Sequence, residues 1–269
     1  MNASRLIRRS LLTVALALSA SAAWAQAQAT QKPFEPSVGQ AGKDVVWVPT
    51  SQVLVDKMLD LAKVTPQDFV MDLGSGDGRT VITAAKRGAR AMGIEYNPDM
   101  VELSKKNAAA AGVSADRATF LKADLFETDF SKATVITMFL LPQINMKLRP
   151  KILAMTPGTR VVSITFTMED WEPEERVEVG GECTTWCTAL FWIVPAKVEG
   201  TWKMPQGELT LKQQFQMLTG TLGSNAISNA KMRGNDITFT AGGMTYTGRV
   251  NGTSIQGTGG GAWTASKIK

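Results

Sequence analysis

The sequence contains no histidine, and this absence excludes several kinds of active site. A Ser-His-Asp triad and a Cys-His pair are excluded, because in both an imidazole takes up the proton of the nucleophile. The commonest general base is missing too, so any reaction must depend on positioning more than on a strong base. A usual zinc site is also excluded, since two cysteines cannot supply four ligands without histidine. We therefore expect no metal.

Cysteine is almost as scarce as histidine. Cys183 and Cys187 are the only two, and they enclose the segment Thr184-Thr185-Trp186. In a protein exported to an oxidising compartment, the first interpretation of such a pair is a disulfide that closes a small loop. A free pair of thiols is the alternative that the sequence leaves open.

The chain has little net charge of either sign. The formal total is +5, and three of the positive charges lie within residues 1–25. Residues 26–198 carry a net charge of −2, whereas residues 199–269 carry +4. Neither value is large enough to indicate a nucleic-acid partner.

Long apolar runs are missing apart from residues 11–20, near the N-terminus. Three arginines and no acid precede this run, and the small-residue site Ala23-Trp24-Ala25 follows it. This pattern predicts a secretory signal peptide over residues 1–25, which is too short to span a membrane. We therefore expect an exported, periplasmic protein without a transmembrane span in the mature chain. Arg8-Arg9 also resembles a twin-arginine signal, so the export route stays open.

A glycine-rich turn is the most informative stretch of the chain. Phe69-Val70-Met71 reads as a buried strand and residues 80–87 read as a helix, so Gly74, Gly76 and Gly78 fall in the strand-to-helix turn. Glycines there let the backbone approach a ligand, and the helix that follows offers unpaired N–H groups. Arg79 stands where a dinucleotide-binding turn would have its third glycine, which favours a ligand without pyrophosphate.

The run from Asp72 to Arg79 resembles motif I of the class I S-adenosylmethionine-dependent methyltransferases. The resemblance implies a Rossmann-like α/β sheet with flanking helices and S-adenosyl-L-methionine as the cofactor. It also implies that Asp72, Gly74, Gly76 and Gly78 face the amino-acid end and the ribose of that cofactor.

Two further acids follow the next two predicted strands. Glu95 ends the strand over residues 91–94, and a carboxylate at this place can accept both ribose hydroxyls. Helix capping is the other interpretation of Glu95, but Asn97 is the better N-cap, with Pro98 suited to the first helical position. Asp124 and Leu125 follow the strand over residues 118–123, where the family resemblance implies contacts to adenine. Three acids at three strand ends describe one pocket.

Candidate residues for the methyl acceptor lie farther along the chain. Leu141 and Pro142 follow the fourth strand, and Asp170 and Trp171 stand in an acidic stretch after the fifth. Over residues 45–196 the chain is similar to a subgroup that includes mitochondrial lysine N-methyltransferases. This resemblance implies a protein lysine or a small amine as the acceptor, with the carboxylates attracting a cation and the ring packing on it. The other interpretation of the acidic stretch is a solvated loop.

The last 71 residues have a different pattern from the rest. Short alternating segments between Gly and Asn turns predict an antiparallel β domain of roughly six to eight strands. We therefore divide the chain into a signal peptide (1–25), a flexible entry segment (26–44), a methyltransferase domain (45–198) and a β domain (199–269). The β domain carries no catalytic constellation and is a candidate for binding an envelope partner. The alternative to an enzyme is an exported, non-catalytic binding protein that retains the methyltransferase fold.

Overall fold

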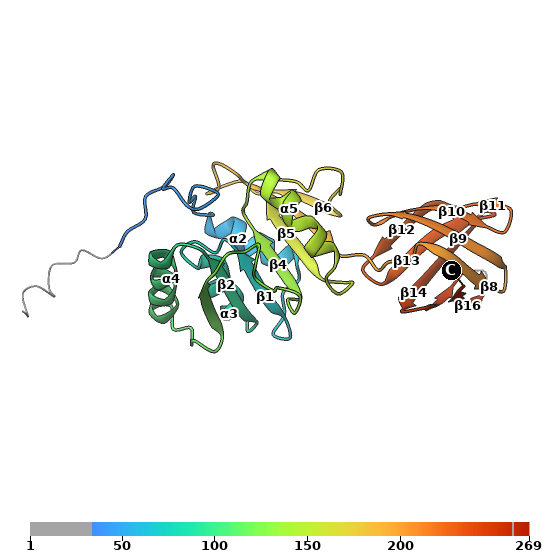
Figure 1. Cartoon of the computed structure of the whole chain (residues 1–269), viewed down its shortest axis with the longest axis horizontal. Helices are drawn as coiled ribbons and strands as arrows, with labels where there is room; N and C mark the ends of the chain where they lie inside the picture. Colours follow the sequence, from blue (N-terminus) through green and yellow to red (C-terminus); the bar gives the residue numbers. More distant parts are fainter. Residues whose placement is uncertain (1–33, 260, 269) are drawn as a thin grey trace, which may run out of the picture. The chain divides into compact units, whose positions relative to one another are not determined.

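The computed structural model describes residues 34–259 and 261–268. The predicted signal peptide therefore lies outside the described residues. The first helix among the described residues is α2 (Gln52–Leu61). Two strand-and-helix units follow, β1 (Phe69–Leu73) with α3 (Arg79–Lys86) and β2 (Arg90–Glu95) with α4 (Pro98–Ala110), and then the strand β3 (Ala118–Lys122). The remaining elements of this part are β4 (Val135–Met138), α5 (Pro142–Leu153), β5 (Arg160–Ile164), β6 (Glu175–Glu178) and β7 (Thr188–Ile193). Figure 1 shows them in sequence colours.

These seven strands form one sheet in the order β3-β2-β1-β4-β5-β7-β6. The first five are parallel, β7 runs antiparallel to β5, and β6 runs antiparallel to β7. The strand order reverses between β1 and β4, and ligands of such sheets bind at the carboxyl ends of the strands beside this point. The predicted Rossmann-like sheet is confirmed.

Helices cover both faces of the sheet, because its central strands are apolar on both sides. One core joins residues of α2, α3 and α4 to side chains such as Val70, Val135 and Val162. The other joins α5 to Met71, Ile136 and other residues of the same strands. All four residues of β4 are buried, as expected for a central parallel strand.

The ends of the helices follow local rules. The Asn97 side chain accepts a hydrogen bond from the Asp99 amide at 2.9 Å, so Asn97 is the N-cap of α4 as predicted. Helix α5 begins at Pro142. Proline suits the first turn of a helix, because a missing N–H costs nothing there.

The C-terminal residues form a second, antiparallel sheet. Its strands are β8 (Gly200–Met204), β9 (Gly207–Gln214), β10 (Met217–Leu222), β11 (Asn225–Ala226), β12 (Ser228–Arg233), β13 (Asp236–Ala241), β14 (Met244–Asn251), β15 (Ser254–Thr258) and β16 (Ala262–Lys267). Because β9 also pairs with β10, eight strands close into a barrel, and the two-residue β11 adds to its edge. The barrel has its own core, in which the rings of Phe239 and Tyr246 stack with centroids 5.0 Å apart. The predicted small all-β domain is confirmed.

Part of the predicted entry segment is folded. Ala41 and Val46 form an antiparallel bridge, and the Gly39 and Trp47 backbones are joined by a hydrogen bond of 2.9 Å. Residues 39–47 therefore form a short hairpin, which we call the entry hairpin. Among the described residues, no helix has the length and apolar character needed to cross a membrane.

Candidate functional site

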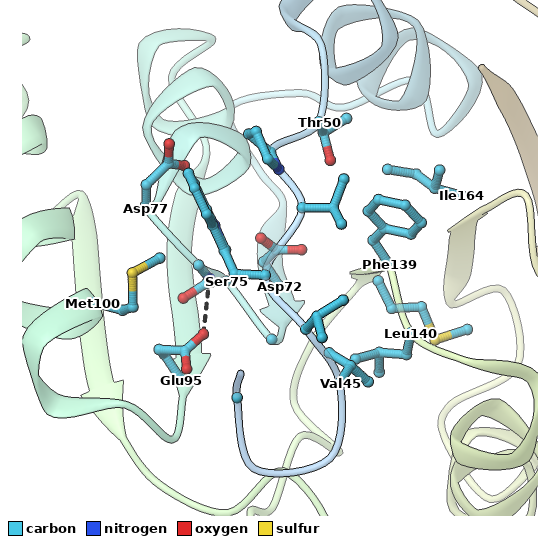
Figure 2. A pocket seen from close by; sticks show the side chains of 18 of the residues that line it. Val45, Thr50, Asp72, Ser75, Asp77, Glu95, Met100, Phe139, Leu140 and Ile164 are labelled. Carbon is cyan, nitrogen blue, oxygen red and sulfur yellow. Dashed lines mark hydrogen bonds between the residues drawn. The ribbon is translucent and has the colours of Figure 1, made fainter. Parts of the chain in front are cut away.

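A cavity of about 530 Å³ opens at the carboxyl ends of β1, β2, β4 and β5, beside the switch point of the sheet. Figure 2 shows that Glu95, Ser75 and Met100 lie on one side of it, and Phe139, Leu140 and Ile164 lie on the other. Asp72 lies between these two groups (Figure 2). The cavity thus has a polar side on β1 and β2 and an apolar side on β4 and β5.

The glycine turn forms the floor of the polar side, where Gly74 and Gly76 line the cavity and Gly78 does not. Gly74, Gly76 and Gly78 all have positive φ, at 79°, 54° and 84°, which side-chain-bearing residues rarely adopt. A Cβ added at Gly76 would lie 2.8 Å from Nε1 of Trp47. The backbone here therefore needs glycine for its conformation and for its close approach to the entry hairpin.

Asp72 is buried beneath the turn, with only 6% of its surface exposed. Burial raises the pKa of its carboxyl group to about 7, and the charges of Glu95 and Asp77 act in the same direction. The Thr137 hydroxyl opposes the shift by donating a hydrogen bond to Oδ1 at 2.6 Å. The carboxyl group is thus poised to change its charge when a cationic ligand enters the cavity.

Glu95 is held by two backbone amides. Gly76 N donates to Oε2 and Asn97 N donates to Oε1, both at 2.9 Å. An ionised carboxylate has about four acceptor positions, so these two bonds fix the group and leave capacity for ligand hydroxyls. Glu95 therefore joins the glycine turn to the start of α4 and still faces the cavity.

The polar side fits the amino-acid and ribose part of S-adenosylmethionine. Ser75 lines the cavity, and its hydroxyl is buried beside Gly93 with no hydrogen-bond partner within the described chain. A buried hydroxyl without a hydrogen-bond partner costs free energy unless a ligand or a water molecule forms that hydrogen bond. Together with the glycine cradle and the Glu95 carboxylate, it makes a set of polar groups that would hold such a cofactor.

Asp124, the predicted adenine contact, forms an ion pair with Lys43 of the entry hairpin. Its Oδ1 accepts a hydrogen bond from the Phe126 amide at 2.9 Å. Lys43 lines the cavity, whereas Asp124 and Leu125 lie outside the residues that line it. Their contact with adenine stays a prediction.

The entry hairpin is a part of the site that sequence reasoning missed. Residues 40–50 all line the cavity, and Arg79 of α3 donates to the Thr50 carbonyl oxygen while its guanidinium pairs with Asp77. The little apolar periodicity over residues 26–43 concealed this segment. The Ala41–Val46 bridge and the indole of Trp47 against Gly76 hold it in place.

The predicted acceptor residues have different outcomes. Leu141 lines the cavity, whereas Pro142 is the first residue of α5 and does not. Asp170 is exposed and forms an ion pair with Arg149. Trp171 is 1% exposed and packs against Trp192, with ring centroids 6.2 Å apart. The structure therefore does not bring Asp170 and Trp171 to the cavity, because the turn that bridges Met168 and Trp171 directs the indole into the core.

Aromatic side chains that the sequence did not single out line the apolar side instead. Phe139 follows β4, Phe166 follows β5, and Trp186 comes from the loop before β7. A disulfide joins Cys183 to Cys187, with their Cα atoms 5.7 Å apart, so it closes the loop that carries Trp186.

Comparisons with known proteins agree with this geometry. The family model of the ANTKMT methyltransferase domain matches residues 72–175. A protein-lysine N-methyltransferase of Saccharolobus islandicus is 45% identical over 138 residues, which cover 50% of this chain and 85% of that protein. The adenine nucleotide translocase lysine N-methyltransferase of mouse is 39% identical over 142 residues, which cover 52% of this chain and 60% of the mouse protein.

A solved structure is also similar. It is described as an RNA methyltransferase from Salinibacter ruber in complex with S-adenosyl-L-homocysteine. The two proteins are 48% identical with a TM-score of 0.52, over 56% of this chain and 96% of that one. The chain thus belongs to the class I S-adenosylmethionine-dependent methyltransferases, in the subgroup that contains protein-lysine N-methyltransferases.

Proposed function

We propose that this methyltransferase acts on the side-chain amine of a lysine in a protein. One observation carries the proposal: at the switch point of the sheet, a single cavity joins a polar side suited to the cofactor to an apolar, aromatic side. The names of the Saccharolobus and mouse relatives support a lysine acceptor. The match covers less than two thirds of the mouse protein, so the specific substrate remains part of the proposal.

The residues of the chain would act by orienting two reactants. S-adenosylmethionine supplies an electrophilic methyl group when bound. The Glu95 carboxylate and the glycine turn would fix the ribose and the amino-acid end, and the apolar side would hold the alkyl stem of the acceptor. The acceptor nitrogen attacks as the neutral amine, after its ammonium proton has left to water. The missing histidine is then no obstacle, since positioning supplies most of the rate.

An RNA acceptor is the second candidate, because the Salinibacter structure is described as an RNA methyltransferase. Charge favours the protein acceptor. Residues 26–198 have a net charge of −2. Among the described residues that line the cavity, the two cationic side chains, Lys43 and Arg79, are each in an ion pair. RNA binding usually needs several unpaired cations facing phosphates.

We further propose that the protein acts outside the cytosol. The signal-like pattern of residues 1–25 supports export, and a disulfide between Cys183 and Cys187 suits an oxidising compartment. Fractionation of cells that express the full chain would test the location. Recovery of the protein with an intact N-terminus in the cytosol would contradict it.

Cofactor binding is the first test of the function. Calorimetric titration of residues 26–269 should show binding of S-adenosylmethionine and S-adenosylhomocysteine. Glu95→Ala should weaken both by about 10- to 100-fold, because hydrogen bonds to a charged group contribute about 1.5–3 kcal/mol each. Glu102→Ala, on the exposed face of α4, is the matched control and should bind like the parent.

The acceptor is tested by labelled methyl transfer. We expect the label in protein lysines of an envelope extract and not in added RNA. Label confined to RNA would contradict the lysine proposal, and unchanged cofactor affinity in Glu95→Ala would contradict the assignment of the ribose site.

A further inference from the structure

Three aromatic rings form a continuous wall on the apolar side of the cavity. Phe139 and Phe166 stack with centroids 6.2 Å apart, and Trp186 lies 5.3 Å from Phe166 and 6.3 Å from Phe139. All three line the cavity, and they come from the ends of β4, β5 and the loop before β7. We call these three residues the aromatic wall.

The sheet order places the aromatic wall opposite the cofactor side. The glycine turn and Glu95 belong to β1 and β2, whereas the wall belongs to β4, β5 and β7, on the other side of the switch point. Figure 2 shows Phe139 and Ile164 across the cavity from Glu95 and Ser75. A group that lies against the wall therefore faces the cofactor without occupying its site.

Phe166 is fixed by the fold itself. Thr165 before it has a φ of 59°, a left-handed conformation that is strained for a β-branched residue. The Phe166 carbonyl oxygen accepts hydrogen bonds from Ser163 Oγ at 2.8 Å and from Asn145 Nδ2 at 3.1 Å. Asn145 is fully buried, so this turn is anchored in the core and directs the Phe166 ring toward the cavity.

Trp186, in contrast, is fixed by a covalent loop. Its side chain is 46% exposed, which is unusual for an indole, and its φ is 57°. The Cys183–Cys187 disulfide closes the loop around it, and the Val179 amide donates to the Cys187 carbonyl oxygen at 2.9 Å. An exposed aromatic ring in a strained and covalently closed loop is a feature that stability alone does not require.

We propose that Trp186 is a specificity-determining residue, held by the Cys183–Cys187 disulfide, and that the aromatic wall receives the methylated lysine side chain. This rests on the proposed lysine acceptor. The faces of aromatic rings attract ammonium groups, and recognition of quaternary ammonium is the best-known use of such contacts. A methylated ammonium group is larger and less hydrated than a simple one, so each methyl group added strengthens its contact with the rings. The wall would thus retain mono- and dimethyl-lysine between transfers; each would release its ammonium proton to water before its nitrogen accepts the next methyl group, and the retention would favour trimethylation.

The test uses two short peptides with the sequence acetyl-Gly-Lys-Gly-amide, one unmodified and one with Nε-trimethyl-lysine. Each is titrated into the full mature chain loaded with S-adenosylhomocysteine. We expect the trimethyl-lysine peptide to bind more tightly than the unmodified one. Trp186→Ala should weaken its binding about tenfold, and Trp186→Phe should restore part of the affinity. Thr184→Ala, an exposed change in the same loop, is the matched control.

The disulfide is tested by Cys183→Ser/Cys187→Ser and by reduction of the parent protein. Both should weaken trimethyl-lysine binding, and reduction should have no further effect in Trp186→Ala. The affinity for S-adenosylhomocysteine should stay within twofold in every variant, which also shows that the variants fold. In turnover, Trp186→Ala should shift the product from trimethyl- to monomethyl-lysine.

The outcomes separate the two proposals. A parent protein that does not bind S-adenosylhomocysteine would overturn the proposed function. A parent that binds it, but shows equal peptide affinity with and without Trp186 or no peptide binding at all, would overturn the role of the aromatic wall.

Discussion

Asp72 illustrates how one buried residue links stability to binding. A carboxylate under the glycine turn is held away from water, and two neighbouring acids add repulsion, so the pKa of Asp72 rises to about 7. In the unfolded chain the same group has an ordinary pKa of about 4. The folded protein therefore binds one more proton than the unfolded protein between these two pH values.

The first prediction concerns the pH dependence of stability. Because the pKa of Asp72 is raised in the folded state, its contribution is fully present below pH 4 and is lost as the pH rises toward about 7. From below pH 4 to above pH 7 we expect the contribution of this group to the free energy of unfolding to fall by roughly 4 kcal/mol. Asp72→Asn should remove the fall. Urea denaturation at pH 5 and pH 8 should show roughly 2–3 kcal/mol of this fall in the parent and none in the variant. An equal change in free energy of unfolding in both proteins would contradict the prediction.

A cationic ligand should reverse the shift. The ammonium and sulfonium groups of S-adenosylmethionine favour the ionised carboxylate, so binding near pH 6 should release a proton. Calorimetry in two buffers with different ionisation enthalpies detects that proton. Asp72→Asn is the control, and no proton should be released when it binds the ligand.

At the scale of elements, the entry hairpin is tied to the end of β3 by one ion pair. Lys43 Nζ pairs with Asp124 and lies 4.9 Å from the centroid of the Tyr96 ring. The pair raises the pKa of Lys43 and lowers that of Asp124, so both groups are charged at neutral pH. The hairpin also lines the cavity, so it forms part of the wall around a ligand bound there.

Lys43→Met should therefore increase the dissociation rate of S-adenosylhomocysteine by a few-fold, because an exposed ion pair contributes little. Asp124→Ala should have a larger effect, since it would remove the pair and the predicted adenine contact together. Stopped-flow displacement gives both rates. Tighter binding by Lys43→Met would contradict this scheme and would mean that Lys43 competes with the ligand for Asp124.

The sequence predicted the elements whose signal is local. The glycine turn, Asp72 and Glu95 stand directly at the ends of apolar strands, and the order of parallel strands brings such residues to one edge. The same rule failed for Trp171. The rule predicts that a residue after a strand lies at the edge of the sheet, but it does not predict whether the loop turns the side chain into the cavity or into the core. Trp186 was missed because the long-range pairing of β5 with β7 brings its loop to the cavity. The entry hairpin was missed because contacts with residues far along the chain, Lys43 with Asp124 and Trp47 with Gly76, place it there.

At the scale of the molecule, the buried residues of the seven-stranded sheet and those of the barrel form separate hydrophobic clusters. The sheet packs against α2 to α5 through two clusters, and the barrel encloses a third. The residues that line the cavity and all the predicted cofactor residues lie before residue 198, in the part of the chain that forms the seven-stranded sheet. The boundary at residue 198 between two domains remains a prediction, although the strands of the barrel begin at Gly200.

Ligand-dependent melting tests that boundary. If the sheet domain and the barrel unfold separately, calorimetry of residues 26–269 should show two transitions. S-adenosylhomocysteine at about 100 times its Kd stabilises the domain that binds it by about 2.7 kcal/mol, so one transition should move up by several degrees. The other should stay in place, because the barrel holds none of the binding residues. Glu95→Ala is the control: the same ligand concentration is only about 1 to 10 times its Kd, so the stabilisation should fall to about 0.4–1.4 kcal/mol and the transition should move correspondingly less. A single transition that shifts as a whole would show that the two cores unfold together and that the barrel adds to the stability of the catalytic fold.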